Sequence, residues 1–321
     1  MDGYNLNDRL NSVRDTTSEK KLKRYALDDY SEKVREIAVS KITDPALLCY
    51  IVKNDRSINV AKRAVQNIDD EEALYNLFME LSKIGITQYH EIYSAIIEKI
   101  ASHAIAGEKI LAEIVLNDSR WAIRREAVIK ITNQKVLVEL ALNHSDDIVR
   151  KEAVKKIANH EVLVEIALND SDANVRQEAV KKIANQEVLV EIASNDFHWI
   201  RREAVKRITN QEVLVEIALD NQERDVCSEA VKRITNQDVL MEILLNDSYD
   251  DFSDDAIEGI SDKEVLLEIL SVKSPNFVRN AADKINDQLI LLDLALSNES
   301  VAENLDMESE IFYKALKKEV S

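Results

Sequence analysis

Residues 136–187 read VLVELALNHSDDIVRKEAVKKIANHE and then VLVEIALNDSDANVRQEAVKKIANQE, two nearly identical units of 26 residues. The motif returns as VLVEIASNDFHWIRREAVKRITNQE at residues 188–212 and as VLVEIALDNQERDVCSEAVKRITNQD at residues 213–238. A fixed period between about 20 and 50 residues is typical of stacked supersecondary units, none of which can bury its apolar face alone. The sequence therefore predicts a repeat protein.

The array extends in both directions from these four copies. Clear copies start at Ile110, Val239 and Val265, and weaker copies start at Leu22 and Ala46. The two ends of the chain are atypical, as expected of caps that close an array. We predict a single array of about ten repeats over residues 1–321. It is divided into an N-terminal cap at 1–19, divergent repeats at 20–69, an irregular repeat at 70–107, regular repeats at 108–286 and a C-terminal cap at 287–321.

Each repeat is predicted to contain two helices. Residues Val162 to Leu168 are apolar except for Glu165, as in a short helix held between neighbouring repeats. Apolar side chains then recur with the period of an amphipathic helix, at Val175, Ala179, Val180 and Ile183. The chain has only 4 glycines and 2 prolines, which disfavours hairpin-rich β folds. The sequence thus predicts an all-α protein.

The second helix carries a pattern that several repeats share. It reads D-x4-V-R-x2-A-x3-I and runs from Asp170 through Val175 and Arg176 to Ala179 and Ile183. This pattern resembles HEAT-like repeats, in a version shorter than usual, and also leucine-rich-variant repeats. The resemblance covers nearly the whole chain and implies a right-handed α-solenoid whose second helices line the concave side. It leaves the function open, because such arrays serve as scaffolds, transport receptors, DNA glycosylases and metalloenzymes.

Some repeats match the pattern and others depart from it. Asp29 with Arg35 and Asp118 with Arg124 keep the spacing, and Asp196 with Arg201 keeps it with one residue deleted. The aspartate is replaced in one copy and the arginine in three, at His144, Ala61, Cys227 and Ser253.

The arginine of the pattern is predicted to be structural. Arg176 lies within the apolar arc of its helix, and a buried arginine is tolerated only when it is paired. Asp170, six residues earlier, is the predicted partner. We interpret the Asp–Arg series as an internal ladder that holds the repeats in register.

Charged side chains form rows along the predicted second helices. Five glutamates each precede a base by four residues, and such pairs are predicted to support a solvated helix: Glu126, Glu152, Glu178, Glu203 and Glu229. Seven other bases have no carboxylate at this spacing, and they predict a positive stripe on the concave side: Arg125, Lys151, Lys155, Lys181, Arg202, Lys206 and Lys232. On the first helices a glutamate recurs at one solvent position, so the outer face is predicted to be acidic.

The two tryptophans are candidate anchors for a partner. Trp121 and Trp199 both fall in the predicted turns between helices, and Phe197 and His198 accompany the second of them. Exposed aromatic side chains are typical of the centre of a protein interface. The alternative is that each tryptophan fills a gap left by a shortened turn.

The sequence predicts neither a metal site nor a cofactor. The pairs His90-Glu91 and His160-Glu161 are similar to the iron ligands of deoxyhypusine hydroxylase, a HEAT-like protein, but His160 occupies a position that is glutamine in other repeats. Cys49 and Cys227 lie far apart and form no ligand cluster. No phosphate-binding loop or catalytic spacing is recognisable.

Composition and charge narrow the possible locations and functions of the protein. The start MDGYNLNDRL lacks the features of a signal peptide, and no apolar run is long enough for a membrane span, so we expect a cytoplasmic protein without membrane contact. The net charge of −18 opposes nucleic-acid binding. We predict a non-enzymatic scaffold that binds an acidic protein or peptide along its concave surface. The alternatives are a nucleic-acid-binding protein similar to HEAT-like DNA glycosylases and, third, a HEAT-like metalloenzyme or lyase-type protein.

Overall fold

A computed structural model describes residues 5–84, 90–219, 223–245 and 252–270, together with residues 281 and 284. In these ranges the regular elements are 20 α-helices, and none is a strand. The all-α prediction and the helical-repeat solenoid are therefore confirmed, while the right-handed superhelix stays a prediction. The predicted C-terminal cap, residues 287–321, lies outside the described residues. The chain divides into two units, Met1–Ile166 and Ala167–Ser321, and each is described by itself.

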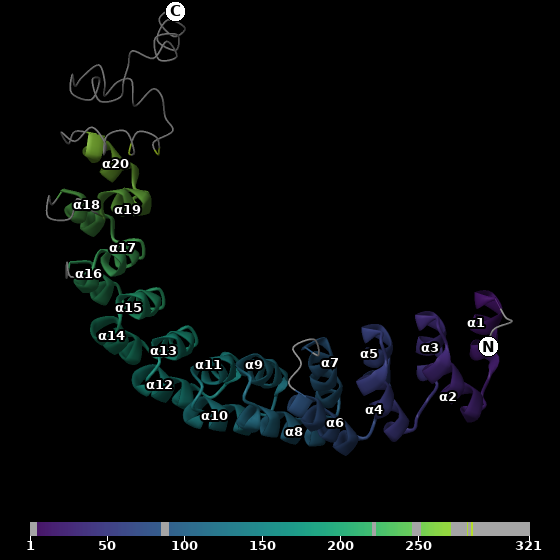
Figure 1. Cartoon of the computed structure of the whole chain (residues 1–321). Coiled ribbons are helices and arrows are strands. Elements are labelled where there is room, and N and C mark those ends of the chain that lie inside the picture. Colours follow the sequence, from purple (N-terminus) through teal and green to yellow (C-terminus); the bar gives the residue numbers. More distant parts are fainter. Residues whose placement is uncertain are drawn as a thin grey trace, which may run out of the picture. The chain divides into compact units, whose positions relative to one another are not determined.

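The first unit contains two rows of helices (Figure 1). Even-numbered first helices follow one another in one row, and odd-numbered second helices follow one another in the other. The bounds are α1 Leu6–Asp15, α2 Glu19–Asp28, α3 Glu32–Val39, α4 Pro45–Asn54, α5 Ile58–Asn67, α6 Glu71–Ile84, α7 His90–Ala101, α8 Ala104–Asn117, α9 Trp121–Lys130, α10 Gln134–Asn143, α11 Asp147–Lys156 and α12 His160–Asn169, whose last residues belong to the second unit.

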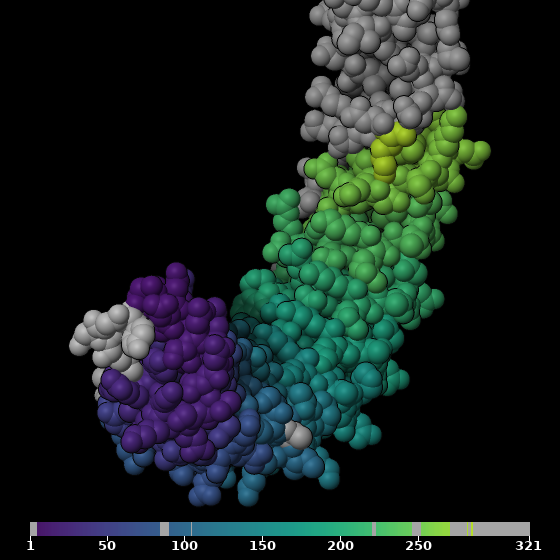
Figure 2. Space-filling model, turned by 90° about the vertical axis from the view of Figure 1, so that its right-hand side faces the viewer, coloured from purple at the N-terminus to yellow at the C-terminus, as the bar shows by residue number. Residues whose placement is uncertain are grey.

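The second unit repeats this arrangement, with second helices of 7 or 8 residues. The side chains of its successive repeats are in contact along the teal and green surface in Figure 2. Its bounds are α13 Ala173–Val180, α14 Gln186–Asn195, α15 His198–Val205, α16 Gln211–Leu219, α17 Arg224–Val231, α18 Gln237–Leu245, α19 Ser253–Gly259 and α20 Lys263–Leu270.

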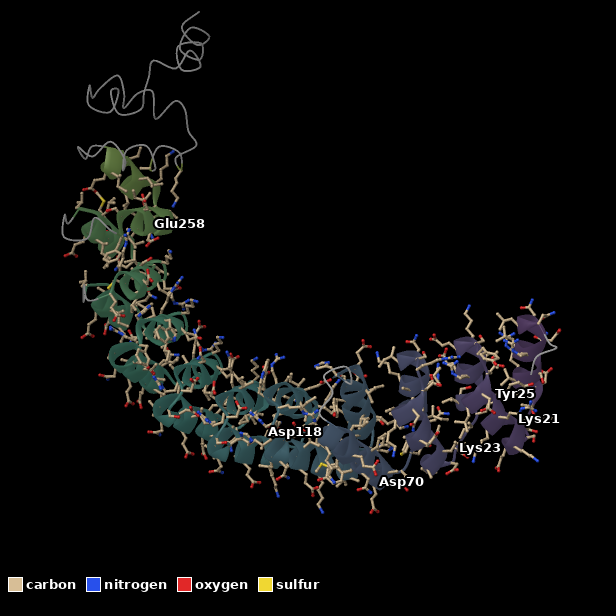
Figure 3. All side chains as sticks on the ribbon, in the orientation of Figure 1. Lys21, Lys23, Tyr25, Asp70, Asp118 and Glu258 are labelled. Carbon is tan, nitrogen blue, oxygen red and sulfur yellow. The ribbon has the colours of Figure 1, made fainter. Side chains whose placement is uncertain are left out.

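The predicted apolar faces form the core between the two rows. Val175, Ala179, Val180 and Ile183 are each at most 1% exposed, as the helical period requires. Asparagines before the first helices act as N-caps; the Asn210 side chain, for example, accepts a hydrogen bond of 2.9 Å from the backbone N–H of Glu212. Charged side chains extend from both rows (Figure 3).

A glutamine side chain joins the two ends of many repeats. Nε2 of Gln186, at the start of α14, donates to the carbonyl of Arg207 at 3.2 Å, and its Oε1 accepts from the N–H of Thr209 at 2.8 Å. Gln134, Gln211 and Gln237 make equivalent contacts. Because the amide is both donor and acceptor, it satisfies two backbone groups that a helix end leaves open. His160 has this position in α12 and is exposed.

The region predicted to be irregular has the longest helices. α6 and α8 each have 14 residues and α7 has 12, whereas the other described helices from α9 onward have 7 to 10. Gly107 lies in the first turn of α8, against the end of α7. A Cβ at this glycine would lie 2.1 Å from the carbonyl oxygen of Ile100, so the two helices approach closely only because the side chain is absent.

Candidate protein-binding surface

The predicted site residues all lie in the second-helix rows or at their ends. In the first unit, Arg125 lies on α9, and Lys151 and Lys155 lie on α11. In the second unit, Arg202 lies on α15, and three lysines directly follow the second helices as C-caps: Lys181, Lys206 and Lys232. Because the seven bases are divided between two units, they are treated as two surfaces.

The prediction that these bases lack a neighbouring carboxylate is wrong. Lys155, Lys181 and Lys206 each form an ion pair of 3.1–3.3 Å with the glutamate three residues earlier, namely Glu152, Glu178 and Glu203. Lys232 pairs with Asp255 at 3.2 Å. The prediction rested on the i,i+4 spacing alone, but the i,i+3 spacing brings two side chains together equally well.

The two arginines of the stripe form ion pairs with the following repeat. Arg125 lies 3.0 Å from Glu152, and Arg202 lies 3.2 Å from Glu229. Partial burial raises the pKa of Glu152, but hydrogen bonds from Lys155 and Arg125 outweigh it and hold that pKa below its usual value. The second-helix surfaces therefore carry paired charges of both signs rather than a bare positive stripe. Among the seven bases, Lys151 has no ion pair with any described residue.

Three of the five bases predicted to pair with a glutamate four residues earlier have another role. Lys156 donates to the carbonyls of Ile129 and Ile131, Arg207 Nε donates to Ile183 O at 2.8 Å, and Arg233 Nη2 donates to Ile208 O at 3.1 Å. Each acceptor lies at the end of the second helix one repeat earlier. These three bases thus donate hydrogen bonds to carbonyls that the end of the preceding second helix leaves unsatisfied. The predicted i,i+4 ion pairs with glutamates are wrong for them.

The arginine ladder exists, but its rungs join neighbouring repeats. Nε and Nη2 of Arg176 bind the carboxylate of Asp196 in the next repeat at 2.9 and 2.7 Å, while Nη1 donates to the backbone carbonyl of Asp170 at 2.8 Å. Arg35 binds Asp55 in the same way. The predicted partner, the carboxylate of Asp170, is therefore wrong, although the predicted role in register agrees with these contacts.

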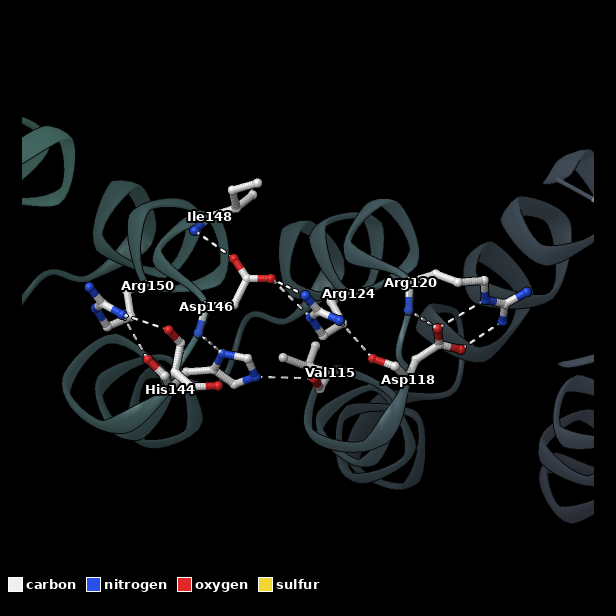
Figure 4. A network of polar contacts seen from close by, with 9 residues as sticks. Val115, Asp118, Arg120, Arg124, His144, Asp146, Ile148 and Arg150 are labelled. Carbon is white, nitrogen blue, oxygen red and sulfur yellow. Dashed lines mark hydrogen bonds and ion pairs between the residues drawn. The ribbon is translucent and has the colours of Figure 1, made fainter. Parts of the chain in front are cut away.

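The rung from Arg124 accommodates a departure from the repeat pattern (Figure 4). Where other repeats have the first aspartate, His144 bonds to the N–H of Asp146 and to the carbonyl of Val115. Asp146 accepts from Arg124 instead, with Nε at 3.0 Å, and caps α11 through the N–H of Ile148. Burial raises the pKa of Asp146, but these hydrogen bonds outweigh it, so its pKa lies below the usual value.

The lowered pKa values of Asp146 and Glu152 predict how stability depends on pH. In the unfolded chain these carboxyls titrate near about 4, so their stabilisation is complete above that pH and is lost as the pH falls through the lower folded-state values. The melting temperature should be nearly constant from pH 7 to about 5 and should decrease below about 4. Thermal unfolding of Asp146→Asn and Glu152→Gln should show a smaller decrease in that range. The exposed Glu139→Gln serves as control, and a decrease as large in both test variants as in the control would contradict the assignment.

The tryptophans lie at the starts of second helices rather than in turns. Trp121 is the first residue of α9 and Trp199 the second residue of α15, which corrects the predicted placement. Trp121 follows Asp118 at the spacing by which Ala173, the first residue of α13, follows Asp170, whereas the turn before α15 is one residue shorter. Trp121 is 58% exposed and Trp199 is 39% exposed, so neither simply fills a gap.

Trp199 belongs to an ordered aromatic pair. Its ring is stacked on that of Phe197, with centroids 4.9 Å apart and an interplanar angle of 1°. The guanidinium of Arg176 lies 5.6 Å from the centre of the Phe197 ring, so the ladder supports the pair from the neighbouring repeat. Phe197 is 52% exposed. The pair is a pre-arranged apolar surface on an otherwise charged row.

The remaining sequence candidates are separate from this surface. His160 is the exposed first residue of α12, and Glu91, beside His90, pairs with Lys62. In the described ranges, no group of three or more His, Cys, Asp or Glu side chains is placed to hold a metal ion. The helices described here include none with the length and apolar character of a membrane span. Sequence reasoning missed a cavity in the irregular repeat, whose aromatic walls show no repeat periodicity.

Comparison with known proteins gives only distant structural likenesses. No protein-family model matches the chain, and no curated protein matches it. A leucine-rich repeat variant with a novel repetitive structural motif is 19% identical, with 80% of this chain and 88% of that chain covered and a TM-score of 0.46. The YibA protein of Escherichia coli is 15% identical, with coverage of 95% and 97% and a TM-score of 0.23. A designed armadillo repeat protein in complex with the peptide (KR)4 is 17% identical, with coverage of 94% and 100% and a TM-score of 0.10.

The architecture itself places the chain among helical repeat proteins. Paired helices form two rows, and the Asp–Arg ladder repeats along them. This arrangement is consistent with a HEAT-like repeat protein.

Proposed function

We propose that this protein is a non-enzymatic interaction scaffold that holds a protein or peptide along its second-helix rows. The observation that carries the proposal is the stacked pair Phe197 and Trp199, which exposes aromatic surface in a fixed geometry. Burial of such rings dominates the binding energy of many interfaces, and rings already held in place lose little entropy on binding. In HEAT-like solenoids this row lines the concave side, which is where we place the partner.

The paired charges of the row support a modest electrostatic contribution. Lys155, Lys181 and Lys206 already have carboxylate partners, so they attract an acidic partner less than bare lysines would. We propose that the partner is held mainly by the aromatic pair and that charge contributes mainly to its rate of association.

Loss of the Trp199 ring should separate these two contributions. A partner captured from nuclease-treated extract and then purified should dissociate about tenfold faster from Trp199→Ala, because an aromatic anchor is lost. Charge reversal of Lys181 and Lys206 to glutamate, in the same unit as Trp199, should change the association rate by less than about threefold, with little effect on dissociation. Both rates are measured by surface plasmon resonance.

Leu168→Ala is the matched control for Trp199→Ala, because Leu168 is 38% exposed and lies on first helix α12. Its dissociation rate should be unchanged. If the partner dissociates from Trp199→Ala and from Leu168→Ala at the same rate, the interface lies elsewhere. A ligand that disappears on nuclease treatment would favour nucleic-acid binding instead.

A further inference from the structure

The irregular repeat of the first unit contains a cavity of about 510 Å³ between helices α6, α7, α8 and α9. Its apolar walls include Phe78, Tyr93, Ile114 and Ile123, each at most 2% exposed. A volume of this size is typical of sites for small organic ligands, which are largely apolar with a few polar groups.

The cavity coincides with a break in the arginine ladder. Ile92, Tyr93, Ile96 and Ile97 of α7 correspond in spacing and burial to Val149, Arg150, Ala153 and Val154 of α11, so a tyrosine stands where a ladder arginine is expected. A positive charge comes instead from Arg120, which lies in the turn between α8 and α9. Its guanidinium carbon lies 4.1 Å over the centre of the Tyr93 ring. An arginine rung is thereby replaced by a cation–π contact.

Arg120 is held by Asp118 and Ser82 and forms part of the cavity wall. Its Nε and Nη2 bind the carboxylate of Asp118 at 3.0 and 2.6 Å (Figure 4). Its Nη2 also donates to Ser82 Oγ at 2.9 Å. The Asp118 side chain is 5% exposed. The hydrogen bonds to Asp118 raise the pKa of Arg120 above its usual value despite its partial burial. The charges of Arg120 and Asp118 cancel locally, so this arginine offers little attraction to an anion.

Two polar groups in the wall remain available for a ligand. The Tyr93 hydroxyl is buried and makes no well-formed hydrogen bond within the described residues; its polar neighbour is the Arg120 guanidinium, which lies over the ring. A buried hydroxyl in this situation gains stability when a ligand bonds to it. Glu113 lies beside Tyr75, whose pKa is raised by burial and by the Glu113 carboxylate. The other titratable group in the wall is His90. With Arg120 and Asp118 balanced, Glu113 gives the cavity a negative charge.

We infer that this cavity binds a small organic cation, a protonated amine or guanidinium carried on an apolar or aromatic body. The body would contact Phe78, Ile114 and Ile123, the cation would pair with Glu113, and a polar atom of the ligand would meet the Tyr93 hydroxyl. An aromatic wall also favours a cation over an anion. The cation can come from a free amine or from a lysine or arginine side chain of a peptide. This site is independent of the scaffold function, since it needs neither Phe197 nor Trp199.

Three probes with one ring separate charge from apolar burial: phenethylamine, 2-phenylethanol and phenylacetate. Isothermal titration calorimetry gives the affinity. Trp121 does not line the cavity but lies between two residues that do, Arg120 and Ala122, so its fluorescence in a Trp199→Phe background is a second signal for binding. We expect phenethylamine to bind most tightly and phenylacetate most weakly. Glu113→Gln should weaken phenethylamine binding about tenfold, because a charge-assisted hydrogen bond is lost.

Glu139→Gln is the matched control, because Glu139 has the equivalent position on α10 outside the cavity, and it should bind phenethylamine as the parent protein does. Tyr93→Phe should weaken 2-phenylethanol, whose oxygen can accept the hydroxyl proton. Acetyl-lysinamide that binds more tightly than phenethylamine would identify a peptide side chain as the source of the cation. No binding at millimolar phenethylamine, equal binding of all three probes, or preference for phenylacetate would overturn the inference, provided that circular dichroism shows each variant folded.

Discussion

Asp55→Ala should destabilise the first unit by about 3–5 kcal/mol, because it leaves a buried guanidinium without its counter-charge. Arg35 is 3% exposed, and its Nε and Nη2 bind the Asp55 carboxylate at 2.8 and 2.9 Å. The same carboxylate accepts from the N–H of Ser57 at the start of α5. The free energy of unfolding is measured by urea titration with circular dichroism as the signal.

A double-mutant cycle tests whether the loss arises from the pair. The variant Arg35→Met with Asp55→Ala removes both charges, so it should be more stable than the sum of the two single changes predicts. Glu80→Ala is the surface control: its ion pair with Lys53 is exposed, and its loss should cost less than about 1 kcal/mol. If the costs of the single changes simply add, Arg35 and Asp55 do not act together.

Gly107→Ala should destabilise the irregular repeat by about 2–3 kcal/mol, although alanine has a higher helix propensity than glycine. The new Cβ would lie 2.1 Å from the backbone oxygen of Ile100, and backbone cannot move aside as a flexible side chain can. α8 would have to shift away from α7. Urea unfolding of the intact chain measures the loss, which should appear in the first unit.

Gly259→Ala provides a matched control in the second unit. There the nearest atom to an added Cβ is the Cδ1 of Leu240 at 3.1 Å, the end of a flexible side chain. We expect a change within about 1 kcal/mol. Equal costs for both glycines would show that the close approach of α7 and α8 is not what requires Gly107.

The sequence predicted the elements well because burial in a repeat follows a period. Val175, Ala179 and Ile183 are spaced so that they share one face of a helix, and the structure confirms that this face is buried. Which repeat a polar side chain reaches is a different matter. Arg176 is close along the chain to several carboxylates, and only the packing of neighbouring repeats selects Asp196 over Asp170.

The charged surface and the cavity were predicted less well for related reasons. Lys181 has a glutamine four residues earlier but a glutamate three residues earlier, and the ion pair with Glu178 uses the i,i+3 spacing that the prediction did not consider. When the irregular repeat is aligned with its neighbours, Tyr93 falls where they have the ladder arginine. This substitution indicates a break in the ladder. The compensating Arg120 lies in a different repeat, so the cavity follows only from both substitutions together.

The hydrogen bonds from Arg207 and Arg233 to the carbonyls of the preceding repeat give the array a direction. If the array is cut between two repeats, the C-terminal piece keeps the arginine, whose long side chain water can hydrate. The N-terminal piece keeps the helix-end carbonyls, which have lost their donor. The two new ends are therefore unequal, and the end that faces the C-terminus needs a replacement donor. An array of this kind can gain or lose repeats from its N-terminal side with little penalty, whereas growth at its C-terminal side must bring a base with every added repeat.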